Sequence, residues 1–258
     1  ARHGILGPLI RSIFIPEKDH EWGIFDYSQQ EPRLVVHYAS LRHFTGADKF
    51  VDSYQEDEKT DFHTMVSEMA DIPRKQAKTI NLGLFYGMGK GKLMSQLGVN
   101  LETASELLAS YNERVPFVKQ LMNDTMNKAG KKGYLSTLEG RRCRFDQWEP
   151  TNEWGQKSLP LAEAQQQYGE HMIKRAWTYK ALNRLIQGSA ADQTKKAMLE
   201  LDKEGYLAHI QVHDELDFSV ASDADKNKIK DIMENCVELA VPSKVDVECG
   251  KNWGDAGD

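Results

Sequence analysis

The sequence predicts an α+β fold in which an antiparallel sheet carries a largely helical inserted sub-domain. Apolar runs flank a charged centre at residues 211–217 (QVHDELD), a pattern typical of a tight β-hairpin with charge at its tip. A second apolar run, residues 22–25, ends at Asp26 and is typical of a buried strand. Helical spacing of apolar residues from residue 73 to residue 129 predicts the inserted sub-domain.

Composition bounds the class of protein. A chain of 258 residues can bury a sizeable core, as one domain or as a domain with a sub-domain. The formal net charge of −6 does not by itself indicate nucleic-acid binding, so local basic patches must carry that evidence. Three cysteines without close pairing or metal-ligand spacing favour a reducing compartment. No bilayer-spanning run or signal peptide is visible, so we expect no membrane partner.

The first third of the chain is predicted to place two carboxylates at element ends. Residues 1–10 show no helix or strand pattern, whereas residues 13–15 and 22–25 predict two short strands. The second strand ends at Asp26, and a helix opens at Glu31, where the following proline suits the first turn. Both carboxylates would therefore face a ligand from the ends of ordered elements.

Two helices follow a segment that composition predicts to be a loop. Residues 45–60 are polar and rich in turn formers, residues 61–69 predict a short helix, and residues 73–86 predict a second helix. In the second helix, spacing by four places two cations, one apolar residue and one aromatic on a single stripe. The stripe consists of Arg74, Lys78, Leu82 and Tyr86. Its cations can hold phosphates, and its apolar end can stack on a base.

The next segment predicts a turn and two further helices. Residues 87–91 (GMGKG) lack the Walker spacing of a phosphate loop, and we interpret them as a turn. Helices are predicted over residues 101–114, with Asn100 as the cap, and over residues 116–129.

A basic cluster surrounds a predicted hairpin at residues 133–145. A solvated charge run and a contact with a phosphate backbone both remain open interpretations of this cluster. Its members are Lys128, Lys131, Lys132, Arg141, Arg142 and Arg144.

The last third of the chain predicts mostly helix around the central hairpin. Residues 146–158 predict an irregular loop, and residues 159–204 predict helix with a break near residues 188–189. Asn183 and Gln187 lie one turn apart, where their amides can contact a minor groove or serve as plain surface groups. A helix over residues 223–239, capped by Ser222, and a strand over residues 245–248 complete the chain.

Asp26 and Asp214, at two predicted strand ends, suit a pair of magnesium ions, which prefer oxygen ligands and keep several waters. Two such ions roughly 3.5–4 Å apart can activate an attacking hydroxyl and stabilise a leaving oxygen. A rival interpretation is a phosphohydrolase that uses adjacent His213 and Asp214, with His63 recruited as a ligand. The strand pattern around His213 disfavours it, because such sites usually draw their ligands from helices.

Three long motifs in this order resemble family A DNA polymerases, the DNA polymerase I type. Residues 26–33 (DYSQQEPR) resemble the first palm motif of that family, residues 74–87 (RKQAKTINLGLFYG) its fingers helix, and residues 211–215 (QVHDE) its third motif. Shorter stretches are also similar: residues 137–142 (TLEGRR), 187–192 (QGSAAD) and 250–253 (GKNW). The resemblance runs from about residue 10 to the end of the chain.

The resemblance implies magnesium-dependent, template-directed transfer of dNTPs to a primer 3′-hydroxyl. Its partners would be primer–template DNA and dNTPs, and its location cytoplasmic, or the host cytoplasm if the chain is viral, with an organelle left open. It implies a first part of the palm at residues 1–70, a fingers sub-domain at residues 71–130 and a second part of the palm at residues 131–258. An extension of the fingers into residues 131–180 stays open.

The resemblance also implies roles for single residues. Asp26 and Asp214 would hold two Mg²⁺ ions with help from the Tyr27 carbonyl, and Glu215 would be a supporting catalytic acid. Glu31 would be the steric gate that excludes a ribose 2′-hydroxyl. The other nucleotide contacts would be Gln29, Arg74, Lys78, Leu82 and Tyr86. The DNA contacts would be Arg141, Arg142, Asn183, Gln187, Gln211 and His213.

Two departures from the family pattern matter. Leu82 stands where the family usually has Phe or Tyr, which predicts altered discrimination against dideoxynucleotides and slower incorporation. The family's thumb, its primer-contacting segment and an exonuclease domain are not recognised in this sequence. We therefore expect a separate or removed N-terminal polypeptide to supply a thumb.

Two alternative functions remain. One is a relative of single-subunit RNA polymerases, against which Glu31 argues because such an enzyme must admit the 2′-hydroxyl. The other is a non-catalytic DNA-binding or assembly subunit. It is disfavoured because Asp26, Asp214 and the cations of the helical stripe occur together.

Overall fold

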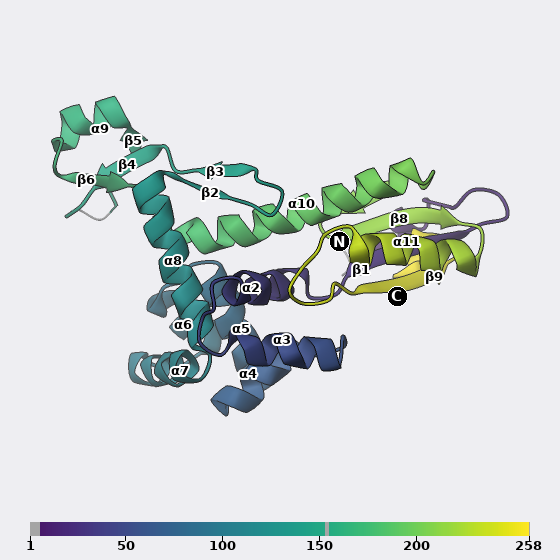
Figure 1. The fold of residues 1–258 in the computed structure, drawn as a ribbon, viewed down its shortest axis with the longest axis horizontal. Helices are drawn as coiled ribbons and strands as arrows, with labels where there is room; N and C mark the ends of the chain where they lie inside the picture. Colours follow the sequence, from purple (N-terminus) through teal and green to yellow (C-terminus); the bar gives the residue numbers. More distant parts are fainter. Residues whose placement is uncertain (1–5, 153–154, 258) are drawn as a thin grey trace. The chain divides into compact units, whose positions relative to one another are not determined.

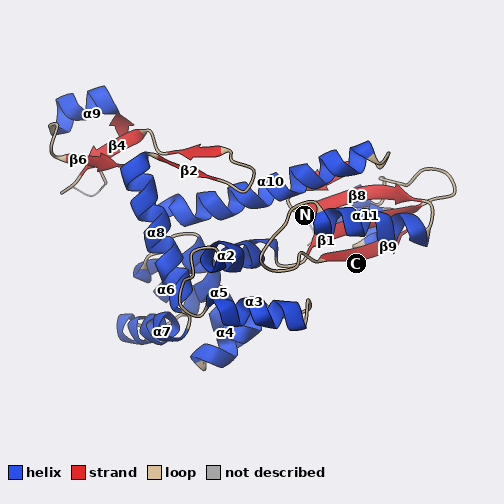
Figure 2. Ribbon diagram, in the orientation of Figure 1, coloured by secondary structure: helices blue, strands red, loops and turns tan. Residues whose placement is uncertain are grey.

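The computed structural model describes residues 6–152 and 155–257, which divide into two compact units. The first unit comprises Ala1–Leu34, Tyr54–Lys59 and Ala190–Asp258, and the second comprises Val35–Ser53 and Thr60–Ser189. Figure 1 follows the chain through its elements by colour, and Figure 2 separates helices from strands. The segment 71–130, expected to be a sub-domain, lies wholly in the second unit, whereas residues 1–70 contribute to both units.

An antiparallel four-stranded sheet forms the centre of the first unit. Its strand order is β7-β8-β1-β9, and each neighbouring pair is antiparallel. The bounds are β1 Glu21–Tyr27, β7 Ile210–Val212, β8 Glu215–Val220 and β9 Val245–Gly250. Together with the helices, this sheet confirms the predicted α+β class and the predicted hairpin.

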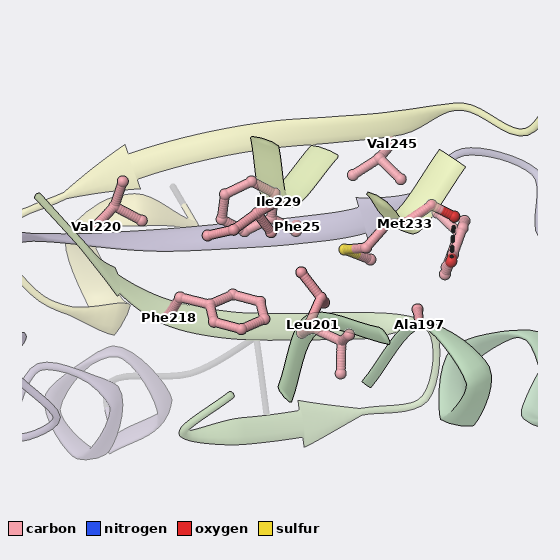
Figure 3. Packing of buried hydrophobic residues seen from close by; sticks show 10 residues of the cluster. Phe25, Ala197, Leu201, Phe218, Val220, Ile229, Met233 and Val245 are labelled. Carbon is pink, nitrogen blue, oxygen red and sulfur yellow. Dashed lines mark hydrogen bonds between the residues drawn. The ribbon is translucent and has the colours of Figure 1, made fainter. Parts of the chain in front are cut away.

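One face of this sheet is the hydrophobic core of the first unit. Side chains of α10 (Ala181–Lys203) and α11 (Asp223–Asn235) pack on it, because alternate strand residues point to the same side. Phe25 and Phe218 meet there with ring centroids 5.5 Å apart. Figure 3 shows them with Leu201 and Ile229, and its dashed line at Met233 marks a hydrogen bond from the core-facing Tyr27.

The other face is only partly apolar. Trp22 and Ile24 pack there against Ala256 of α12 (Trp253–Ala256). The short helix α1 (Leu6–Arg11) brings the Arg11 guanidinium 4.4 Å from the Trp253 ring centroid. This face also carries acidic residues, among them Asp26, Glu215, Asp217 and Asp246. The sheet therefore has one apolar face and one face that is partly apolar and partly acidic.

The second unit is mainly helical, around a cluster of aromatic rings. Phe62 lies at its centre, with ring centroids 5.2 Å from Phe50, 6.5 Å from Phe117 and 6.0 Å from Phe85. Between residues 30 and 132, the helices that lie wholly or partly in this unit are α2 Gln30–Ser40, α3 Ala47–Glu56, α4 Phe62–Ala70, α5 Arg74–Phe85, α6 Lys90–Leu97, α7 Leu101–Arg114 and α8 Pro116–Lys132. Helices α2 and α3 contribute residues to both units.

Two small sheets complete the second unit. The first is the predicted hairpin, β2 (Tyr134–Ser136) with β3 (Arg142–Arg144). The second has the order β5-β4-β6, with helix α9 beside it. Its elements and the turn that follows are β4 Gln147–Pro150, β5 Leu159–Pro160, α9 Leu161–Tyr168, β6 Ile173–Arg175 and the 3₁₀ turn Thr178–Lys180.

Several elements differ from the sequence predictions. Residues 13–15 form no strand, and part of the predicted loop at residues 146–158 is β4. The segment 45–60 contains α3, because Ala47, Phe50 and Tyr54 recur at helical spacing and are fully buried. Polar composition concealed that spacing. Helix α6 was also not predicted.

The predicted helix at residues 159–204 is wrong in its first half and in its break. The chain forms strands and α9 before residue 181, and α10 then runs without interruption through Gly188. A Cβ on Gly188 would lie 2.7 Å from the Thr137 side chain, so the glycine permits close packing inside a continuous helix. Helix α11 ends at Asn235, earlier than the predicted residue 239. No helix in the described part of the chain is long and apolar enough to cross a membrane.

Candidate functional site

Asp26 lies near the end of β1, and Asp214 lies in the turn between β7 and β8, at the same end of the four-stranded sheet. Residues 213 and 214 form the turn between β7 and β8, and His213 adopts a φ of 57° there. The Tyr27 N–H donates to the Asp214 carbonyl over 3.4 Å, and Asp26 pairs in register with Glu215. The backbone ladder therefore brings two acidic residues from distant parts of the sequence to adjacent positions.

A row of carboxylates crosses three strands at this end. Asp26 of β1 is paired with Glu215 of β8 on one side and with Asp246 of β9 on the other. Directly paired residues of antiparallel strands point to the same face, so these three share the partly acidic face of the sheet. Glu215 is buried, and the Trp253 indole donates to it over 3.4 Å.

Asp217 continues this acidic face one row further along the sheet. Its exposed fraction is 0 %, and neither carboxylate oxygen has a hydrogen-bond partner within residues 6–152 and 155–257. Burial, and then the charge of Glu215, raise the pKa of Asp217 to about 7, against the opposing influence of Arg11 and Trp22. No role was predicted for Asp217 from the sequence, although its spacing of two from Glu215 in a strand places both side chains on one face.

The Tyr27 side chain lies in the core, whereas its main-chain carbonyl lies at the end of β1. Its hydroxyl donates to the Met233 carbonyl over 2.7 Å, and burial raises the pKa of the phenol far above its usual value. The side chain is therefore committed to the core, so that any contact with an ion would come from the Tyr27 main-chain carbonyl. No group of three or more His, Cys, Asp or Glu side chains in the described ranges is arranged to hold a metal ion.

The start of α2 follows the strand end directly. Gln29 has a φ of 54°, and Glu31 lies in the first turn of α2. Arg33 is buried and donates to three main-chain carbonyls, from Nε to Ser28 over 2.9 Å, and from Nη1 and Nη2 to Pro242 and Glu58, each over 2.6 Å. These bonds fix the segment between β1 and α2 within the first unit, and so support the local backbone around Glu31.

The four-residue stripe of α5 belongs to the second unit and is open to solvent. Arg74, Lys78 and Tyr86 are exposed and Leu82 is partly exposed, whereas Ile80 and other residues of the opposite face are buried. Gly87 ends this region with a φ of 67°, and a Cβ there would lie 2.6 Å from a main-chain oxygen of the neighbouring turn. The helix thus presents its cations and its aromatic end along one accessible face.

Four predicted DNA contacts lie in the second unit, two at the β2–β3 hairpin and two on α10. The Arg141 Nη2 donates to the Gly188 carbonyl over 2.8 Å, and the Arg142 guanidinium lies 4.7 Å from the Tyr134 ring centroid. Asn183 and Gln187 lie one turn apart on α10, where Asn183 is partly exposed and Gln187 is exposed.

The other two predicted DNA contacts lie in the first unit. Gln211 and His213 are exposed at the β7–β8 hairpin, and the Gln211 amide donates to the His213 carbonyl over 3.1 Å. The sequence-predicted residues thus divide between the two units, with the carboxylates in the first and the helical cations in the second.

The polar contacts that hold α5 against α4 and α7 were not predicted from the sequence. The Asn81 side chain, fully buried, bonds the His63 Nδ1 over 2.9 Å and accepts from the Tyr111 hydroxyl over 2.5 Å. Asp61, just before α4, binds Arg74. Only the cap pattern at Asp61 was visible in the sequence, and nothing there pointed to its partner. His63 is thus bonded within the helical unit, away from the role of metal ligand considered for the rival phosphohydrolase.

Comparisons with known proteins agree with the motifs. Residues 4–255 match the sequence model of the family described as DNA polymerase family A. A protein named DNA-directed DNA polymerase from Pseudomonas phage M6 is 38% identical over 285 aligned residues, which cover 95% of this chain and 40% of that protein. DNA polymerase I of Rhizobium leguminosarum is 34% identical over 97% of this chain and 24% of its own length.

A solved structure shares the fold. The structure titled as the POL domain of Pol1 from M. smegmatis in complex with DNA primer-template and dNTP has a TM-score of 0.77 and 28% sequence identity. It covers 99% of this chain, which spans 44% of that chain. The chain therefore spans less than half the length of these relatives.

Proposed function

Because the chain belongs to DNA polymerase family A, we propose that it is the catalytic part of an enzyme for template-directed DNA synthesis. The reaction would join a dNTP to a primer 3′-hydroxyl with release of pyrophosphate. The observation that carries this proposal is the adjacency of the end of β1, with Asp26, and the β7–β8 turn, with Asp214. Two carboxylates at one sheet end suit a phosphoryl transfer that depends on positioning and charge neutralisation.

The residues at this end fit magnesium. Asp26 and Asp214 supply hard oxygen donors, and the Tyr27 carbonyl adds a third, which is a sufficient protein set for ions that retain waters. Two bound Mg²⁺ ions would supply activation of the primer hydroxyl and stabilisation of the leaving oxygen. Glu215, buried beside Asp26 and bonded to Trp253, would keep the strand end acidic and ordered.

The residues proposed to recognise the nucleotide lie at the start of α2 and on α5. Glu31, in the first turn of α2, would exclude a 2′-hydroxyl, with Gln29 beside it. Arg74 and Lys78 would bind the triphosphate through charge-assisted hydrogen bonds, since both are exposed on one helix face. The apolar end of that stripe, Leu82 and Tyr86, would contact the base or sugar.

Primer–template DNA would be bound by the exposed polar and basic groups. Arg141 and Arg142 suit contacts with phosphates, whereas the amides of Asn183 and Gln187 suit a minor groove. Gln211 and His213 would contact the primer terminus from the hairpin. The relatives are longer than this chain, and further polypeptide with a thumb would hold the duplex product.

Primer extension with a magnesium titration tests the proposal. We expect incorporation of dNTPs in the order set by the template and dependent on magnesium. Incorporation of NTPs would instead indicate a relative of RNA polymerases. Duplex binding without incorporation, also in the presence of a thumb-containing upstream fragment, would indicate a non-catalytic DNA-binding or assembly subunit.

A substitution at the steric gate sharpens this test. Glu31→Ala should raise the use of NTPs relative to dNTPs roughly tenfold or more, because the group that blocks the 2′-hydroxyl is removed. An unchanged preference would contradict the role given to Glu31. Processivity measured with and without the upstream fragment then tests the thumb: full processivity of the chain alone would contradict that part of the proposal.

A further inference from the structure

We propose that Asp61 is a positioning residue that holds the Arg74 guanidinium in a fixed orientation for the triphosphate of an incoming dNTP. This inference rests on the proposed function, because it takes the exposed stripe of α5 as the nucleotide-binding face. The two cations of that stripe are not equivalent. Arg74 is engaged by Asp61, whereas Lys78 makes no hydrogen bond or ion pair within the part of the chain that the structure describes.

The contact between the two side chains is bidentate. The Arg74 Nη2 donates to Asp61 Oδ2 over 2.9 Å, and its Nε donates to Asp61 Oδ1 over 3.2 Å. Two parallel bonds match the planar guanidinium to the planar carboxylate and fix the direction of the fork. The Nε–Nη2 edge of Arg74 is thereby occupied, which leaves the Nη1 side for an anion.

The carboxylate that holds Arg74 is itself fixed. Asp61 is the N-cap of α4, where its Oδ1 accepts from the Thr64 N–H over 2.6 Å and from the Thr64 hydroxyl over 2.8 Å. The Thr64 hydroxyl oxygen also accepts from Arg74 Nε over 3.1 Å. Rotation of the Asp61 side chain would therefore break the cap of α4 as well as the contact with Arg74.

Buried contacts hold α4 and α5 together behind this exposed pair. Asn81 of α5 bonds His63 of α4 over 2.9 Å, and both residues are buried. The Phe62 and Phe85 rings pack with centroids 6.0 Å apart. Arg74 is thus tied through Asp61 to a helix that is packed against its own helix, so that its guanidinium has little freedom to turn.

The ion pair with Asp61 affects both the net charge and the orientation of the Arg74 guanidinium. Partial burial favours a raised pKa for Asp61, but the bonds from Arg74 and Thr64 outweigh it and lower that pKa. Asp61 stays ionised and offsets part of the positive charge of Arg74. The pair therefore attracts an anion less strongly than a lone arginine would, but its guanidinium is held in one orientation. Lys78, with a flexible stem, would supply the mobile charge.

A double-mutant cycle tests this role in the full chain. Binding of dATP with magnesium is measured by calorimetry, and KM and kcat by primer extension, for Asp61→Asn, Arg74→Ala and the double variant. Asparagine is also a good N-cap, so Asp61→Asn removes the charge and keeps the cap. The matched control is Asp124→Asn, since Asp124 also binds an arginine, Arg42, in the same unit.

We expect Asp61→Asn to weaken dATP binding and raise KM about three- to tenfold with little change in kcat. An effect of this size is typical of the coupling between two residues in direct contact. In the Arg74→Ala background the same substitution should have no further effect, and Asp124→Asn should leave binding unchanged. An effect of equal size in both backgrounds, or tighter binding by Asp61→Asn, would overturn the inference while the proposed function stands. Absence of dATP binding by the parent chain, with and without primer–template, would overturn both.

Discussion

The two units carry their charged groups in opposite ways. In the first unit, carboxylates sit on strands, where the ladder fixes them and burial removes them from water, as for Glu215 and Asp217. In the second unit, cations sit on one face of α5 and remain exposed, as for Arg74 and Lys78. Strand register alone can set the spacing of short acidic side chains. Long cationic side chains need a neighbour to direct them, and Arg74 has such a neighbour in Asp61.

The largest expected effect concerns the carboxylates fixed by strand register. Asp26→Asn and Asp214→Asn should each reduce primer extension by on the order of 10²–10³-fold or more, the loss typical of removing one preorganised charge-stabilising group. Both residues lie where β1 meets β8. Rate constants measured at saturating dNTP and magnesium check this expectation.

Asp246 provides the matched control, because it pairs with Asp26 on the opposite side, across β1 and β9. Asp246→Asn should retain most of the activity if the reaction uses the β1–β8 side of the row. Equal losses for all three variants would mean that the whole acidic row acts as one unit, and the side assigned to the ions would be wrong.

The sequence predicted more about the first unit than about the second. The hairpin at residues 210–220 and the strand before α2 were predicted from apolar runs, which report strand burial directly. Helices α4, α5 and α7 were predicted from spacing and caps, including the Asn100 cap. Each of these elements has apolar spacing or a cap residue that is visible in its own short stretch of sequence, so no knowledge of tertiary contacts was needed to predict it.

The sequence predictions that were wrong or missing share a cause, because they depend on tertiary contacts that local sequence patterns do not reveal. Gly188 suggested a break, but it permits close packing against Thr137 within a continuous helix. Helix α3 was concealed by its polar composition, although Phe50 packs against the distant Phe62 and Phe117 rings. Likewise the partner of Arg74 is Asp61, which no local pattern identifies. Tertiary contacts of this kind decide which glycine breaks a helix and which cation is held.

Asp217 offers a second test of the buried charge in the first unit. Its folded pKa of about 7 lies above the usual aspartate value of 3.8, so between these values the folded state binds a proton that the unfolded state has released. Stability should therefore fall as pH rises from about 4 to 7. Asp217→Asn removes this dependence, and its unfolding free energy relative to the parent should rise by about 2–4 kcal/mol over that range.

Urea denaturation in the presence of EDTA, followed by circular dichroism across this pH range, measures the difference. Near pH 4 the advantage of the variant should be smallest, which serves as the internal reference. A constant difference at all pH values would show that Asp217 is ionised in the fold, and would contradict the effect of its burial.

His37 gives the opposite pH dependence in the second unit. Burial, and then the charge of Arg42, lower its pKa from 6.5 to about 4, so the unfolded state takes up a proton first as pH falls. Stability should be lost as pH falls from about 6.5 to 4, by about 1–3 kcal/mol. His37→Gln should lack this loss, with its difference from the parent constant above pH 7. A parallel decline of parent and variant would contradict the prediction.

The smallest expected effect concerns Leu82 on the exposed stripe of α5. Leucine packs against a sugar or base without the stacking of an aromatic ring, so Leu82→Phe should speed incorporation about two- to fivefold, in line with an aromatic contact of order 0.5–1.5 kcal/mol. It should also change the ratio of dideoxynucleotide to deoxynucleotide use. Single-nucleotide incorporation with each substrate measures both quantities, and Leu84→Phe, on a different face of α5, is the control for added ring volume.

Equal kinetics for Leu82→Phe and the parent would contradict a role of position 82 in nucleotide contact. The exposed face of α5 would then bind the nucleotide through its cations alone, so that Arg74, directed by Asp61, and Lys78 would be its only nucleotide contacts on that helix.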